Sequence, residues 1–238
     1  MVDKEYVDQW LKLLLRKLQD AFGQRLLLVV NVGSWARNDA NGQSDIDVNV
    51  VLDKVMLEDI ILYRSLVAEM PDNQLACGFL GGLNEMDLWP RYDLMAFHYG
   101  CIVLHGSVPD VLGAVSRRDI FENAMVGLST ISHAVRHCMV YDSCLVTSAN
   151  GLRDFYKATF FVLQGWYLLK YGEYVATRKN MMDRLTESDA KAVLTAYLMW
   201  DDLQEERNVN PLQTLVRLER WSSLMFEKMA TVLIQNDH

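Results

Sequence analysis

The chain has 238 residues, of which 51% are apolar and 23% charged, so it can bury one large core or two smaller ones. Its formal net charge of −8 argues against a protein whose main task is to bind the nucleic-acid backbone. No apolar run approaches the roughly 18 residues of a membrane span, and no signal peptide is visible at the N-terminus. The four cysteines are scattered and contain no Cys-x-x-Cys pair, which indicates reduced thiols used as small apolar fillers in a cytoplasmic protein.

The first part of the chain mixes helical and strand patterns. Helices are expected where apolar residues recur at helical spacing, and strands where branched residues cluster or alternate with polar ones. In chain order we expect a helix over 4–22, a buried strand over 25–32, an alternating strand over 45–52, a helix over 55–69, a strand over 74–80, a short helix from Asp93 through His98, and an edge strand over 101–104.

Beyond Pro109 and Gly113 the strand signals become rare and long helical patterns take over. They cover 119–141, 148–171, 188–206 and 211–234, with Ser148 as a cap and Pro211 at the start of the last helix. The sequence therefore predicts the α+β class: an N-terminal α/β domain of residues 1–112, followed by an all-α helical bundle of residues 113–238.

Two carboxylates open the alternating strand. Asp45 and Asp47 are two residues apart, so both project from one face, roughly 6–7 Å apart at the backbone, while Ile46, Val48 and Val50 face the other way. Hard Mg²⁺ binds carboxylate oxygens and retains much of its water, so two fixed acids together with substrate phosphates are sufficient ligands. The pair is a candidate site for one Mg²⁺ ion or two close ones.

A glycine–serine bend ends the preceding strand. Gly33 would allow a phosphate to approach the backbone, the hydroxyl of Ser34 would donate to it, and Arg37, on the first turn of a helix starting there, would neutralise its charge. Taken singly, such pieces are most often an ordinary turn and a solvated strand face. Their order, with the bend ending one strand and the acid pair opening the next, favours a site that transfers nucleotides.

These residues also carry a resemblance. The segments Gly33-Ser34-Trp35-Ala36-Arg37-Asn38-Asp39 and Ser44-Asp45-Ile46-Asp47-Val48 resemble the signature of the polymerase-β-type nucleotidyltransferase superfamily, in its small bacterial and archaeal branch. That branch includes aminoglycoside nucleotidyltransferases and partners of HEPN-type toxins, and the helical half is similar to HEPN-type bundles. The specific match covers about twenty residues, and a weaker similarity of element order extends to about residue 106.

The resemblance implies a small mixed sheet flanked by helices, and transfer of a nucleoside monophosphate from ATP or another NTP to an acceptor hydroxyl. It implies Asp45 and Asp47 as metal ligands, and Gly33, Ser34, Arg37 and Ser44 as nucleotide contacts. The family usually adds a third carboxylate on an adjacent strand, but 74–80 contains no acid. Glu85, which follows that strand most closely, is the candidate for this role, against the alternative of a solvated loop acid.

We therefore expect an Mg²⁺-dependent nucleotidyltransferase that moves AMP to a hydroxyl, with an aminoglycoside-like small molecule as the first hypothesis for the acceptor. The alternatives are an antitoxin-like regulator that nucleotidylates or binds a protein partner, and a nucleotide-binding protein without activity. Neither a membrane nor a nucleic acid is an expected partner, and a homodimer is possible. His133 and His137, four residues apart on a predicted helix, suggest a partly buried polar face rather than a zinc site.

Overall fold

The computed structural model describes residues 2–141, 149–200 and 211–234, and it divides into two compact units, Met1–Val115 and Ser116–His238. The expected domain boundary lay after residue 112. Among the described helices, none is long and apolar enough to cross a membrane.

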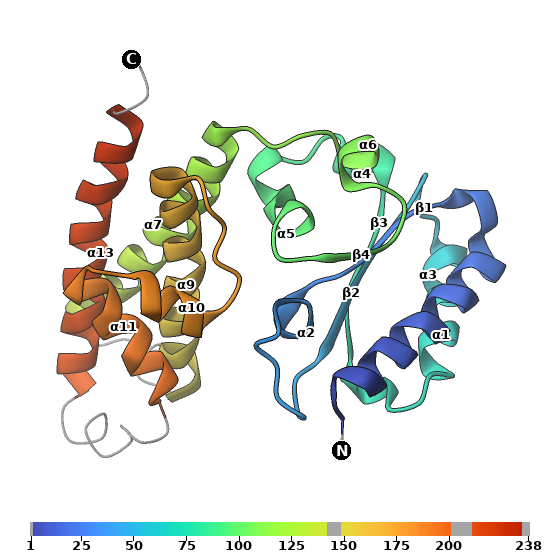
Figure 1. The fold of residues 1–238 in the computed structure, drawn as a ribbon, viewed down its shortest axis with the longest axis horizontal. Helices are drawn as coiled ribbons and strands as arrows, with labels where there is room; N and C mark the ends of the chain where they lie inside the picture. The colour runs from blue at the N-terminus through green and yellow to red at the C-terminus, as the bar shows by residue number, and fades with distance from the viewer. Residues whose placement is uncertain (1, 142–148, 201–210, 235–238) are drawn as a thin grey trace. The chain divides into compact units, whose positions relative to one another are not determined.

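The first unit is built on a mixed four-stranded sheet (Figure 1). The strands β1 (Leu26–Asn31), β2 (Ile46–Leu52), β3 (Ala76–Gly82) and β4 (Ile102–His105) lie in the order β3-β2-β1-β4. β1 is antiparallel to both β2 and β4, and β3 is parallel to β2. The expected mixed sheet is confirmed, with β4 as one of its edges.

The alternation of β2 separates two apolar layers. Ile46, Val48 and Val50 are buried against α1 (Lys4–Phe22) and α3 (Leu57–Ala68) on one face of the sheet. The opposite face is covered by α4 (Leu83–Met86), α5 (Met95–His98) and α6 (Val108–Leu112), which bury Val51 of β2 and other strand residues (Figure 1). Asp47 and Asn49 alternate with the first set, so they share the second face.

Local signals explain where the first helices begin and end. Asp3 caps α1 by accepting a hydrogen bond of 2.9 Å from the backbone N–H of Tyr6, and Gly23 ends that helix with a φ of 53°. The carboxylate of Asp59 accepts a hydrogen bond of 2.9 Å from the backbone N–H of Met56. It also accepts a hydrogen bond of 2.8 Å from each of the two terminal nitrogens of Arg25. The Arg25 guanidinium lowers the pKa of Asp59, so this buried carboxylate ties α3 to the residue that precedes β1.

Several expected elements differ from the structure. The third strand begins at Ala76 because the preceding residues form the 3₁₀ turn η2 (Asn73–Leu75), and it continues through both glycines to Gly82. Asp93 lies inside the 3₁₀ turn η3 (Arg91–Leu94) instead of capping a helix. The helix expected over 188–206 ends at Leu198, and Ser148 lies outside the described residues.

Helices are the only regular secondary structure in the described part of the second unit (Figure 1). The long helices α7 (Arg117–Tyr141), α9 (Ala149–Tyr171) and α13 (Pro211–Ile234) pack against one another, and α11 (Ser188–Leu198) contacts α9 and α13. The short α10 (Arg178–Arg184) was not predicted, and Thr177 caps it by accepting from the backbone N–H of Asn180 at 3.1 Å. Buried aromatic side chains such as Tyr156, Phe160 and Trp166 of α9 form the core, which confirms a helical bundle.

Candidate functional site

The glycine–serine bend lies where β1 ends. The backbone N–H of Val32 donates to the carbonyl of Asp47 at 2.9 Å, and Gly33 then opens the short helix α2 (Gly33–Arg37). Trp35 of α2 is buried, and its indole N–H donates to the carbonyl of Ser44 at 3.1 Å. This bond connects α2 to the loop that enters β2, so it holds the bend close to the start of β2.

Asp47 packs against the glycine of the bend. Gly33 has a φ of +73°, and a Cβ built on it would lie 1.9 Å from Oδ2 and 2.8 Å from Cγ of Asp47. Only a residue without a side chain therefore fits between the backbone and this carboxylate. The carboxylate is oriented toward the bend, which is the arrangement expected of a site that brings phosphate and metal together.

The backbone around Asp47 is fixed by its neighbours. Its carbonyl also accepts a hydrogen bond of 2.9 Å from the side-chain amide of Asn31, a residue that is fully buried. Asp45 comes immediately before β2, and its side chain is exposed. The strand thus begins one residue later than predicted, with Asp45 just outside it and Asp47 as its second residue.

The structure adds Cys77 to this site. Cys77 is the register partner of Asp47 in the parallel pair β2–β3, and its side chain is exposed. The pKa of its thiol is raised mainly by partial desolvation and then by the negative charge of Asp47, with a smaller contribution from Asp45. Both aspartates therefore lie close to this thiol, whereas the sequence had indicated only a small apolar filler.

Glu85 lies elsewhere, and the expectation that it returns to the aspartates is corrected by the topology. β3 runs parallel to β2, so that Cys77 pairs with Asp47 and Gly82 pairs with Leu52. Glu85 is exposed in α4, beyond Gly82, and the level of Leu52 is about 16 Å along the strand from Asp47. The strand leads away from the carboxylates before this acid is reached.

The other expected nucleotide contacts, Ser34, Arg37 and Ser44, lie in α2 and in the turn that follows it. Ser34 is the second residue of α2, and Arg37 is the last residue of this helix, not a residue of its first turn. The hydroxyl of Ser44 accepts from the backbone N–H of Asn41 at 3.0 Å and donates to the side-chain oxygen of the same residue at 3.3 Å. Ser44 thereby stabilises the turn between α2 and β2, and its role toward a nucleotide stays a prediction.

Clusters of three potential metal ligands are absent from the part of the chain that is described. There, no group of three or more His, Cys, Asp or Glu side chains lies close enough to hold an ion. His133 and His137 are exposed on α7 with their rings stacked at a centroid distance of 6.2 Å. Cys138 is buried, and Asp142 lies outside the described residues.

Comparison with known proteins identifies the first unit. Residues 11–94 match the family model described as "Nucleotidyltransferase domain". A comparison with curated proteins gave no match. The matched segment contains the bend, both aspartates and the first three strands of the mixed sheet, the features that carried the resemblance in the sequence. The N-terminal part of this chain is therefore a nucleotidyltransferase domain of the polymerase-β type.

Proposed function

We propose that the chain transfers a nucleoside monophosphate, AMP, from a nucleoside triphosphate to a hydroxyl group of a small molecule. The observation that carries the proposal is the packing of the Asp47 carboxylate against Gly33, with Asp45 nearby. This arrangement places a carboxylate directly against the glycine–serine bend, and the family match supports transfer of a nucleotide.

The residues of the site fit a hard divalent cation. Asp45 and Asp47 offer carboxylate oxygens, and the missing side chain of Gly33 lets the Asp47 carboxylate lie directly against the backbone of the bend. The two acids would hold Mg²⁺, which when bound neutralises phosphate charge and polarises the phosphorus under attack.

The protein groups would contribute mainly by positioning. Ser34 would donate its hydroxyl to the triphosphate, and the guanidinium of Arg37 would balance part of its charge. The acceptor oxygen would form a bond with the α-phosphorus while the bond to the leaving pyrophosphate breaks. For the acceptor we propose a small molecule such as an aminoglycoside, given the acidic charge of the chain.

The direct test is a crystal structure with a non-hydrolysable ATP analogue and Mg²⁺. We expect triphosphate density beside Ser34 and a metal ion between Asp45 and Asp47. A screen of hydroxyl-bearing acceptors, with release of pyrophosphate as the readout, would then identify the second substrate. Triphosphate bound anywhere other than the bend, with no ion at the aspartates, would contradict the proposal.

Cys77 favours a second candidate, a protein that binds nucleotide and turns over slowly or not at all. The thiol stands opposite Asp47 on the adjacent strand, whereas the resemblance implies a third carboxylate on such a strand. If the lack of a third acid is what limits turnover at this site, Cys77→Asp is expected to strengthen Mg²⁺ binding and raise turnover. Because three carboxylates repel one another without a metal, this variant should also melt at a lower temperature in EDTA than in Mg²⁺.

Thermal melts of the wild type, Cys77→Asp and Cys77→Ser in EDTA and in Mg²⁺ measure this effect. Cys77→Ser is the matched control, since it replaces the thiol without adding charge. We expect the stabilisation by Mg²⁺ to be larger in Cys77→Asp than in the other two proteins. An equal response of all three would show that position 77 does not contribute to the metal site.

A further inference from the structure

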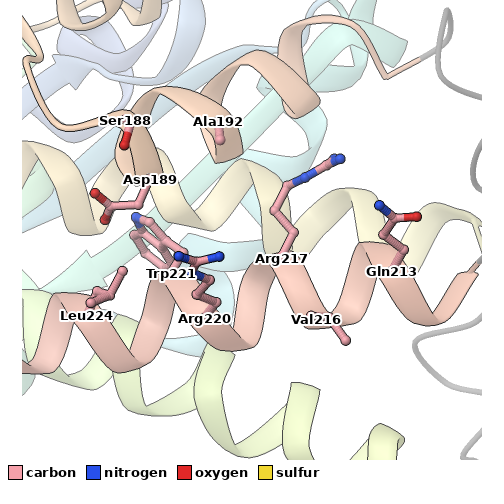
Figure 2. A pocket seen from close by; sticks show the side chains of 9 residues that line it. All are labelled: Ser188, Asp189, Ala192, Gln213, Val216, Arg217, Arg220, Trp221 and Leu224. Carbon is pink, nitrogen blue, oxygen red and sulfur yellow. The ribbon is translucent and has the colours of Figure 1, made fainter.

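The helical unit contains a pocket of its own between α11 and α13. Its cavity of about 430 Å³ lies within the range of roughly 300–1,000 Å³ that small-molecule sites occupy. Figure 2 shows the lining side chains, which come from these two helices alone. Ala192, Val216 and Leu224 supply an apolar wall, and polar and charged side chains supply the rest.

A buried hydrogen-bond donor lines this pocket. Trp221 is 1% exposed, and its indole Nε1 has no hydrogen-bond partner among the described residues. Buried tryptophan N–H groups usually find a partner, so an orphaned donor on a pocket wall points to an acceptor supplied by a ligand. In Figure 2 the indole nitrogen is turned toward the first turn of α11, where Ser188 and Asp189 lie.

Two guanidinium groups line the same pocket. Arg217 and Arg220 are three residues apart on α13, so both lie on one side of the helix. The chain carries a formal net charge of −8, but the two arginines give this cavity a locally positive region. Arginine forks match phosphate oxygens in geometry and charge, which makes a phosphate group the fitting anion.

The α11 end of the pocket has different chemistry. Asp189 accepts hydrogen bonds of 2.8 and 2.9 Å from the ammonium group of Lys228, so its charge is balanced within the protein. A carboxylate has more than one lone pair, and it can still accept from a hydroxyl. A ligand hydroxyl placed between Trp221 and Asp189 would accept from the indole N–H and donate to the carboxylate.

We propose that this pocket binds a small phosphate monoester that also carries hydroxyl groups, as sugar phosphates do. Its phosphate lies on Arg217 and Arg220, a hydroxyl satisfies the N–H of Trp221, and its C–H groups rest on the apolar wall. The site is separate from the bend of the nucleotidyltransferase domain, and the proposal holds whether or not nucleotide is transferred there.

The test uses the full chain with ¹⁵N-labelled indole groups in EDTA, titrated with glucose 6-phosphate. The six tryptophans give one indole signal each, and Trp221→Phe identifies the signal of Trp221. We expect a saturable shift of that signal, a weaker one with inorganic phosphate, and none with glucose. EDTA removes the divalent cation that nucleotide binding at the aspartates would need, so the failure of one proposal is distinguishable from the failure of the other.

Calorimetry with glucose 6-phosphate then tests the donors. Arg220→Gln is expected to weaken binding at least about tenfold, and Trp221→Phe, which keeps an aromatic ring without the N–H, about fivefold. The matched control is Arg118→Gln, an exposed arginine of α7 whose partner is Glu122. Unchanged affinity in Arg220→Gln would overturn the proposal. So would a shift of the indole signal of Trp35, beside the bend, without one of Trp221.

Discussion

Asp47→Asn is expected to reduce nucleotidyl transfer by at least about a thousandfold, because it removes the negative charge that we assign to metal binding. In the same variant, Mg²⁺ should no longer strengthen the binding of a non-hydrolysable ATP analogue. The fold should be retained, since the hydrogen bonds of Asp47 to Val32 and Asn31 involve its backbone carbonyl and not its carboxylate. Calorimetry with and without Mg²⁺ measures the binding, and circular dichroism measures the fold.

Glu85→Gln is the matched control for this experiment. It makes the same change from carboxylate to amide, at an exposed position of α4 toward the opposite end of β3. We expect its activity and its Mg²⁺-dependent nucleotide binding to stay within about twofold of the wild type, as for surface substitutions away from functional groups. A normal rate in Asp47→Asn together with a large loss in Glu85→Gln would show that the metal site had been assigned to the wrong acid.

The parts of the site that could be predicted are those controlled by neighbours in sequence. The two-residue period of β2 places Asp47 opposite to Ile46 and Val48, and this depends only on the pleat of a strand. The end of β1 at Asn31, just before Gly33-Ser34, follows from the break in a run of branched residues. Long helices such as α1 and α7 were recognisable because their apolar spacing persists over many turns.

The parts that could not be predicted depend on pairing between distant segments. Cys77 reaches Asp47 only through the register of a parallel strand pair thirty residues apart, and neither strand encodes that register locally. The same register moves Glu85 away from the site, although it comes soon after β3 in sequence. The sequence does not predict α10, because seven residues are too few for a clear apolar period.

The largest structural effect of a single methyl group is expected at Gly33. Gly33→Ala introduces a Cβ that would lie 1.9 Å from the Asp47 carboxylate, so either that carboxylate or the bend must move by about 1 Å or more. A displacement of this size at a reacting centre costs about a hundredfold in rate. The φ of +73° adds backbone strain of about 1–2 kcal/mol.

Gly23→Ala separates these two contributions. Gly23 also has a positive φ, of +53°, but a Cβ there would meet nothing within 4 Å. We expect both variants to lose unfolding free energy in urea denaturation, and only Gly33→Ala to lose activity and Mg²⁺-dependent nucleotide binding. If both alanine variants transferred nucleotide at the wild-type rate, the contact between Gly33 and Asp47 would not be part of the active site. Because both substitutions place a side chain at a positive φ, a loss of activity confined to Gly33→Ala reports the position of the carboxylate.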